Sequence, residues 1–193
     1  SKLSYNPTRW KTERRVDLSG EASFDVVHND KLPFYVSTTR YKVMVLGTTF
    51  NVKSYPGAAE DYVALKSGKV RIGIFNASSK TLDITPGNCF VFDNTSGRYD
   101  VKPTDSHLFS WEDGEIVFDD QTIVQKKAEL YRLYGYTFRI SKGCSTMSYR
   151  ASFNKEGLNE MMAVFAHITP HMSYKIDDKN KVVSIQEIIK EQP

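Results

Sequence analysis

The chain has 193 residues, of which 40% are hydrophobic and 25% are charged, and its formal net charge at pH 7 is only +3. A chain of this length buries roughly 70% of its unfolded surface and folds without a disulfide framework, and so small a charge does not suggest a nucleic-acid-binding surface. We therefore expect one large or two small globular domains, with no nucleic-acid partner.

The two cysteines, Cys89 and Cys144, are too few for a disulfide scaffold. Two interpretations remain open: a pair of buried thiols, which we favour, and a bridge between two domains. No apolar run approaches the roughly 18–20 residues that span a bilayer, and no signal peptide is present. The sequence opens on S-K-L-S-Y without an initiator Met, so we expect a fragment of a longer protein.

The first strong pattern runs from Arg15 to Val27, where apolar and polar residues alternate on both sides of Gly20. Alternation with period two is typical of strands, so this pattern predicts two short strands separated by the glycine. Leu32–Ser37 predicts a further strand, with Pro33 at its start or on a sheet edge.

The segment Tyr41–Tyr55 reads Y-K-V-M-V-L-G-T-T-F-N-V-K-S-Y and is central to the first half of the chain. It predicts two short strands, or one strand bent at Gly47. A glycine inside a strand pattern marks a bulge or a close backbone approach. Since the segment contains no His, Cys, Asp or Glu, it favours a binding or signalling module over an enzyme.

Several short strands follow, separated by turns that contain Gly68 and Gly87. Their expected ranges are Asp61–Leu65, Val70–Ile74, Leu82–Ile84, Cys89–Phe92 and Tyr99–Val101. We expect Gly20, Gly47, Gly68 and Gly87 to be structural residues. Residues 1–110 therefore predict an all-β, many-stranded domain of the sandwich, jelly-roll or short solenoid type.

The pattern changes after Trp111. Ile116–Phe118 predicts a strand, Gln121–Leu133 an amphipathic helix, and Tyr136–Ile140 another strand. We expect Asp119 or Asp120 to cap the start of the helix and Gly135 to cap its end.

A second unit of the same kind follows. Tyr149–Phe153 predicts a strand, and Asn154 is the expected N-cap of a helix. The apolar stripe of this helix is expected to face the core; it consists of Leu158, Met161, Met162, Phe165 and Ala166. Met172–Ile176 and Lys181–Ile185 predict a hairpin. Residues 111–193 thus read β-α-β followed by β-α-β-β, a small α+β domain.

No pattern in the sequence predicts catalysis, a cofactor or a metal. His167 and His171 have the spacing of a helical metal site, but Pro170 between them breaks the helix. The paired acids fall at turns or helix starts, where they cap or are solvated. An alternative remains: a carbohydrate-active or carbohydrate-binding β protein that uses exposed aromatic residues for stacking. Its candidate residues are Tyr5, Trp10, Tyr99 and Trp111.

Four motifs in order carry a resemblance to a known family: G-E-A-S-F-D-V, V-L-G-T-T-F-N-V, L-K-S-G-K-V and T-P-G. They resemble the periplasmic domain of the FecR family, membrane-bound regulators or anti-sigma factors of cell-surface signalling. The second half, with G-E-I-V-F-D and F-N-K-E-G-L-N-E-M-M-A-V-F, looks like the C-terminal domain of Bacteroidetes-type members, which is similar to the secretin and TonB N-terminal (STN) fold.

The resemblance implies a periplasmic sensor without catalytic activity. It implies a missing cytoplasmic region that binds an extracytoplasmic-function sigma factor, and a missing transmembrane helix in the inner membrane. The implied periplasmic partner is the N-terminal signalling domain of a TonB-dependent outer-membrane receptor. We expect this partner to add a strand to an exposed edge in the C-terminal domain. The expected edge is the last predicted strand, formed by Lys181, Val182, Val183, Ser184 and Ile185.

Overall fold

The computed structural model describes residues 1–75, 81–105 and 108–188. The chain divides into two compact units, Ser1–Phe109 and Ser110–Pro193. Each unit has its own hydrophobic core, and the buried residues of the two cores lie in separate parts of the sequence.

The described part of the first unit is almost entirely β. Its strands are β1 (Lys2–Tyr5), β2 (Arg14–Val26), β3 (Phe34–Ser37), β4 (Tyr41–Val45), β5 (Thr48–Ser54), β6 (Glu60–Ser67), β7 (Val70–Ile74), β8 (Thr81–Ile84), β9 (Asn88–Asp93) and β10 (Tyr99–Pro103). A short 3-10 helix, Pro7–Arg9, follows β1. The strand order is β10-β9-β6-β5-β2-β3-β4-β7-β8, with β1 also paired to β2.

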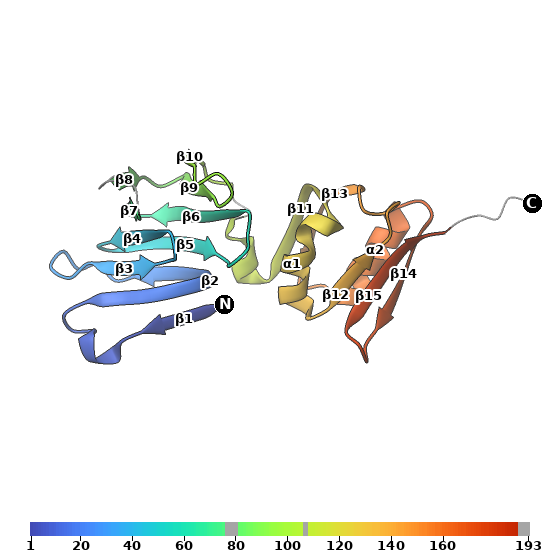
Figure 1. The fold of residues 1–193 in the computed structure, drawn as a ribbon, viewed down its shortest axis with the longest axis horizontal. Helices are drawn as coiled ribbons and strands as arrows, with labels where there is room; N and C mark the ends of the chain where they lie inside the picture. Colours follow the sequence, from blue (N-terminus) through green and yellow to red (C-terminus); the bar gives the residue numbers. More distant parts are fainter. Residues whose placement is uncertain (76–80, 106–107, 189–193) are drawn as a thin grey trace, which may run out of the picture. The chain divides into compact units, whose positions relative to one another are not determined.

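Strand β2 joins two sheets within this strand order (Figure 1). One sheet also contains β1, β3, β4, β7 and β8, and the other also contains β5, β6, β9 and β10. Its first half pairs with β1 and, in parallel, with β3, whereas its second half, Gly20–Val26, pairs with β5. The change of partners occurs at Gly20. The prediction of two short strands is therefore wrong. The alternation on both sides of Gly20 belongs to one strand of 13 residues.

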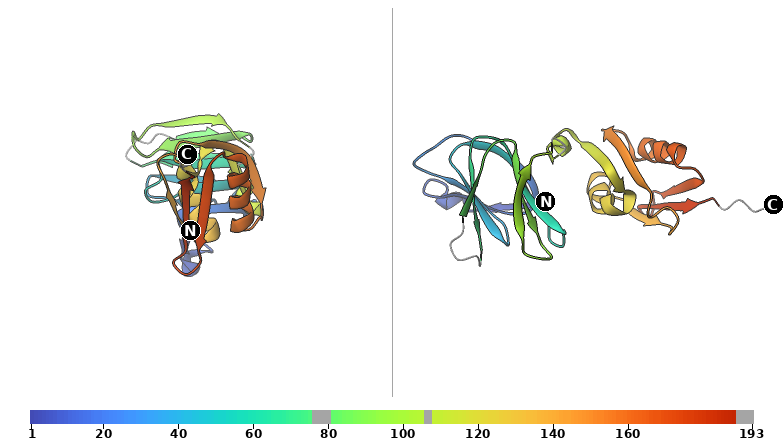
Figure 2. Two further views of the ribbon diagram at one scale, coloured as in Figure 1. Left: turned by 90° about the vertical axis from the view of Figure 1, so that its right-hand side faces the viewer. Right: turned by 90° about the horizontal axis from the view of Figure 1, so that it is seen from above.

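The strands of the first unit curve around a common interior (Figure 2). This interior contains a single core of aliphatic and aromatic side chains contributed by both sheets. Tyr41, Phe50 and Phe90 are its largest fully buried members. Alternation works as predicted here, because successive side chains of a strand point to opposite faces of the sheet. In β4, for example, Tyr41, Val43 and Val45 are buried while Lys42 is exposed.

The predicted interruption at Gly47 is a passage between sheets. Strand β4 ends at Val45 and pairs with β3 and β7, whereas β5 begins at Thr48 and pairs with β2 and β6. Leu46 and Gly47 carry the chain across. Of the two alternatives left open by the sequence, the structure has two strands.

The second unit follows the order β-α-β, β-α-β-β. Its elements are a 3-10 turn (Ser110–Asp113), β11 (Glu115–Thr122), α1 (Ile123–Tyr134), β12 (Thr137–Ile140), β13 (Ser148–Asn154), α2 (Leu158–Ile168), β14 (Met172–Asp177) and β15 (Val182–Glu187). Strands β11 and β13 form one antiparallel pair, and β12, β15 and β14 form a second, three-stranded sheet. Side chains from both helices and both sheets form one core.

The helix boundaries differ from the prediction at their N-terminal ends. Thr122, rather than Asp119 or Asp120, caps α1, because its hydroxyl accepts the backbone N–H of Gln125 while the Gln125 side chain accepts the N–H of Thr122. This reciprocal capping box satisfies two N–H groups that the helix itself leaves free. Gly135 caps the other end in the left-handed conformation, as predicted.

The predicted cap of α2 is also wrong. Asn154 belongs to strand β13, and Gly157 is the N-cap, with its backbone N–H donated to the carboxylate of Glu160. The prediction that the stripe of α2 faces the core is confirmed, since Met161, Met162 and Phe165 are completely buried.

The expected sheet edge at the end of the chain is not an edge. Val182–Ile185 lies in β15, which pairs in parallel with β12 on one side and antiparallel with β14 on the other. Lys181 precedes the strand and is exposed. Being last in the sequence does not make a strand outermost, because the hairpin partner β14 is placed outside it. A partner strand therefore has no free side of β15 to pair with.

Candidate functional site

Within the residues that the structure describes, this sheet has two edge strands, β12 and β14, each paired only with β15. The backbone N–H groups of Thr137 and Ser141 donate to the carbonyls of Lys181 and Ile185, so the odd-numbered residues of β15 direct their backbone groups toward β12. The even-numbered residues of β15 therefore direct their backbone N–H and C=O groups toward β14. Their partners there are Ser173, Lys175 and Asp177.

Because antiparallel partners alternate, the remaining residues of β14 point their backbone groups the other way. These are Met172, Tyr174 and Ile176. Among the residues that the structure describes, no strand pairs with this side of β14. Six residues long, β14 is a larger edge than β12, which has four. A row of unpaired N–H and C=O groups is a template for an added strand.

A depression of about 400 Å³ lies elsewhere in the same unit, where the end of α2 meets the start of β13. Met147, Ile168 and Pro170 provide its apolar lining. Tyr149 also lines it, and its hydroxyl accepts a hydrogen bond from Thr169 at 3.0 Å. Burial raises the pKa of Tyr149 above its ordinary value, so this phenol stays neutral and can only hydrogen-bond.

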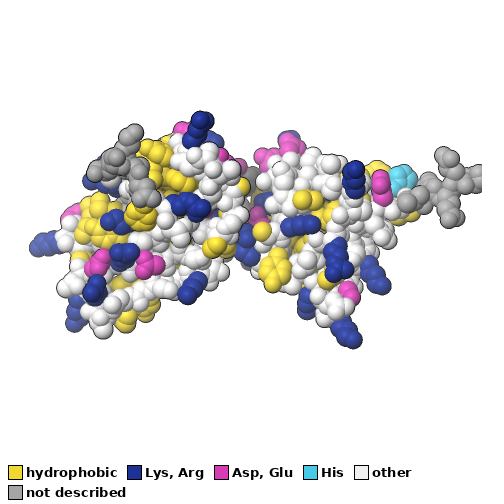
Figure 3. Space-filling view, in the orientation of Figure 1, with side chains coloured by type: hydrophobic (Ala, Val, Ile, Leu, Met, Phe, Trp, Pro, Cys, Tyr) yellow, Lys and Arg dark blue, Asp and Glu magenta, His cyan; other side chains and the backbone are white. Residues whose placement is uncertain are grey.

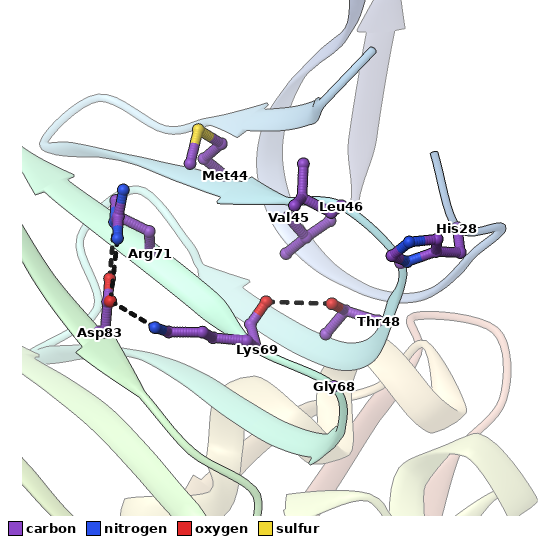
Figure 4. Close-up of a pocket in the computed structure, with 10 residues that line it drawn as sticks. His28, Met44, Val45, Leu46, Thr48, Gly68, Lys69, Arg71 and Asp83 are labelled. Atoms are coloured by element: carbon purple, nitrogen blue, oxygen red, sulfur yellow. Dashed lines mark hydrogen bonds and ion pairs between the residues drawn. The ribbon is translucent and has the colours of Figure 1, made fainter. Parts of the chain in front are cut away.

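A second pocket, of about 480 Å³, lies in the first unit on the outer side of strands β4, β7 and β8 (Figure 4). Met44, Arg71 and Asp83 form a row across these three strands, because they are direct partners in register. Met44 is half-buried and Arg71 exposed. Leu46 and His28 also line the pocket.

Asp83 holds two cations at this pocket. Its carboxylate accepts two hydrogen bonds from Arg71, at 2.7 and 3.0 Å, and lies 2.8 Å from the ammonium of Lys69. The hydrogen bonds from Arg71 and the neighbouring Lys69 hold the pKa of Asp83 well below its usual range. Asp83 is therefore ionised at neutral and mildly acidic pH, and the three groups together carry a net charge of +1.

Two glycines form the inner wall of this pocket. A Cβ placed on Gly47 would lie 2.5 Å from Cα of His28, and one placed on Gly68 would lie 2.7 Å from the carbonyl oxygen of Gly47. Gly68 has a φ of +89°, which favours glycine in its own right. The backbone of Gly47 is not in the left-handed region, so the close approach of His28 is what excludes a side chain there.

A separate polar cluster lies inside the first unit around Asp61, which is fully buried. Its carboxylate accepts hydrogen bonds from Ser54 at 2.6 Å and from the amide of Asn94 at 2.8 Å. Tyr41 lies close by, and burial together with Asp61 raises its pKa well above the ordinary value. These donors are neutral groups that fix one conformation of the strand ends, an arrangement that suits a structural role.

The residues considered for chemistry are not brought together. His167 and His171 are both exposed, and His171 has left-handed backbone geometry beyond the end of α2. Within residues 1–75, 81–105 and 108–188, no three His, Cys, Asp or Glu side chains gather as a metal site requires. Cys89 and Cys144 are both buried free thiols, one in each unit. Burial raises the pKa of Cys89 to about 12, which leaves it unreactive.

Three of the four aromatic side chains considered for carbohydrate stacking contact another aromatic ring, and the fourth, Trp111, lies in the 3-10 turn Ser110–Asp113. Tyr5 meets Trp10 edge to face at 5.5 Å, Trp10 meets Phe34 in the same way, and Tyr99 contacts Phe90. All four remain partly exposed, Tyr5 the most, at 59%. On the face drawn in Figure 3, basic and acidic side chains are interspersed with hydrophobic ones, without a field of one sign.

Comparison with known proteins matches each of the two units to a model of the same protein family. The family model described as "FecR protein" matches residues 1–71, and the model described as "FecR, C-terminal" matches residues 115–183. The chain belongs to the FecR family. This family is regulatory and not enzymatic. No curated protein matches the chain.

Two crystal structures of a protein from Parabacteroides distasonis ATCC 8503, described as a "putative anti-sigma factor", share the fold. Both are 23% identical in sequence to the chain, with TM-scores of 0.78 and 0.77. The first match covers 96% of this chain and 85% of the crystallised one; the second covers 94% and 84%. At this identity the likeness establishes the architecture. In the described part of the chain, no helix is long and apolar enough to cross a membrane.

Proposed function

We propose that the chain is the sensing part of a membrane-anchored anti-sigma factor, located in the periplasm. In this proposal it relays the state of a TonB-dependent outer-membrane receptor to an extracytoplasmic-function sigma factor. The observation that carries the proposal is the match of both units, in order, to the two FecR family models. The fold shared with a protein described as an anti-sigma factor supports it.

The receptor's signalling domain docks on the second unit by adding a strand to β14. Met172, Tyr174 and Ile176 supply the backbone donors and acceptors, as the register of β14 and β15 requires. Their side chains pack toward the core of the unit, so main-chain hydrogen bonds give the affinity and the partner's side chains give the specificity. The second unit is accordingly proposed to be an STN-like domain.

The test uses a matched pair of variants, Tyr174→Pro and Tyr174→Ala. Both remove the same side chain, but only proline removes the outward-facing N–H, which β15 does not use. Binding of the receptor's signalling domain is measured by calorimetry. We expect Tyr174→Pro to weaken binding at least tenfold relative to Tyr174→Ala, with matching loss of sigma-factor activation in cells. Equal binding by the two variants contradicts docking on β14.

Val183, in the middle of β15, is unsuitable for such a test. Its backbone groups face β12, so proline there breaks the sheet itself. A loss of binding in that variant would report unfolding and not the absence of a docking edge.

A further inference from the structure

The pocket bounded by Met44, Leu46, Lys69, Arg71 and Asp83 lies in the first unit, and docking on β14 makes no use of it. We propose that this pocket is a binding site for a small amphiphilic anion, that is, a molecule with an apolar body and one carboxylate or sulfonate group. This inference does not depend on the function proposed above. It gives the first unit a ligand of its own.

The size and the apolar lining of the pocket fit the body of such a molecule. Its volume of about 480 Å³ falls within the range of small-molecule sites, roughly 300–1,000 Å³. Met44 and Leu46 are half-buried and contribute apolar surface. Gly47 and Gly68 contribute backbone alone to the wall, so no side chain projects from them into the space. Met44 is a flexible side chain that adapts to ligands of different shape.

The charges at the rim fit the anionic group. Arg71 uses Nε and Nη2 on Asp83, and a guanidinium has five N–H donors, so donors remain for a second acceptor. Lys69 is held beside it by the same carboxylate, with 65% of its side chain exposed. Asp83 thus positions two cations without neutralising both. A bound anion adds to this arrangement and need not displace Asp83.

The ionised state of Asp83 keeps the arrangement constant from neutral to mildly acidic pH. His28, at the end of the pocket, is paired with Asp30 at 3.1 Å. These two groups lie on the segment that packs over Gly47. The cationic pair Lys69 and Arg71 is the part of the pocket that selects charge.

A pair of fluorescent probes tests the proposal with the whole chain. 8-Anilinonaphthalene-1-sulfonate and N-phenyl-1-naphthylamine share one ring system, and only the first carries a sulfonate. We expect the sulfonate to bind with a dissociation constant in the micromolar range and the neutral probe to bind more weakly. Failure of the sulfonate to bind at millimolar concentration overturns the proposal.

Three variants then locate the site. Lys69→Gln combined with Arg71→Gln is expected to weaken sulfonate binding about fourfold or more, since each exposed cation contributes about 2- to 5-fold. The double variant is expected to leave the neutral probe unchanged. Asp83→Asn is expected to tighten sulfonate binding severalfold, because it removes the one negative charge beside Lys69 and Arg71 and raises the net charge of the three positions from +1 to +2. Met44→Gln is expected to weaken both probes.

The control is Lys102→Gln, which removes one exposed cation from β10, outside the pocket lining. It is expected to leave both probes unchanged, and circular dichroism verifies that each variant is folded. If the double variant and the control bind the sulfonate equally, or if Asp83→Asn does not tighten it, the anion binds elsewhere and the proposal is wrong. With the site located, displacement of the sulfonate by octanoate but not by octanol extends the result to carboxylates.

Discussion

Single residues in the first unit are constrained mainly by space. Gly47 sits against the backbone of His28, whereas a Cβ on Gly73 in β7 would meet only the methyl group of Thr81, at an ordinary contact distance of 3.9 Å. The backbone conformation permits a side chain at both positions, since neither glycine has a left-handed φ. They differ only in what an added methyl group would meet.

We predict that Gly47→Ala destabilises the chain by about 1–3 kcal/mol, the usual cost of overpacking. Gly73→Ala, the matched control, is expected to change stability by less than about 0.5 kcal/mol or to stabilise slightly, because it restricts only the unfolded chain. Urea denaturation of both variants measures the difference. Equal stability of the two would show that the segment carrying His28 moves aside without cost.

The buried carboxylate of Asp61 gives a second prediction at this scale. Ser54→Ala removes a hydrogen bond to the fully buried side chain of Asp61, and leaving a buried polar group without its partner costs about 1–3 kcal/mol. We expect a loss of stability of that size in urea denaturation. Ser23→Ala, at an exposed position of β2, is the control and is expected to be neutral. A neutral Ser54→Ala would mean that Asp61 finds another donor.

At the scale of elements, strand existence follows from alternation but strand partners do not. The pattern around Gly20 looks the same whether the chain makes two strands or one strand that changes partners, because the side-chain period continues across the glycine. Strand β1 gives no such signal, because its four residues are all exposed and so lack a buried face. The central place of β15 depends on parallel pairing with β12, a strand from the other half of the unit. The pocket has no local signal either, since segments distant in the sequence form it.

The first residue of each helix is also not determined by the local sequence alone. Asp119, Asp120, Thr122 and Asn154 are all good N-cap residues by type. Only the observed end of β11 decides among the first three, since that strand continues through both aspartates to Thr122.

We predict that Thr122→Ala destabilises the second unit by about 1 kcal/mol, the typical cost of losing an N-cap. The reason is that both hydrogen bonds of the capping box depend on this residue's position at the helix start. Thr146→Ala, in an exposed turn of the same unit, is the control. Thermal unfolding followed by circular dichroism at about 222 nm measures both; equal midpoints would contradict the role of Thr122.

On the scale of the whole molecule, the two cores share no residue. We predict that fragments 1–109 and 110–193 fold separately, because each retains all of its buried side chains. Each fragment is expected to show one cooperative urea transition and dispersed amide proton resonances. A fragment that stays unfolded on its own would show that its stability depends on the rest of the chain.

Strand β2 has a consequence for how the first unit opens. The two halves of β2 belong to different sheets. Neither sheet can therefore separate from the core without displacing a strand that is still hydrogen-bonded in the other sheet. The sheets are therefore expected to lose protection from hydrogen exchange together. The amides of Val36 in one sheet and Val52 in the other should exchange with the same opening free energy, although the two residues never pair. A change that destabilises one sheet is therefore expected to destabilise the other as well, because the backbone of β2 is part of both.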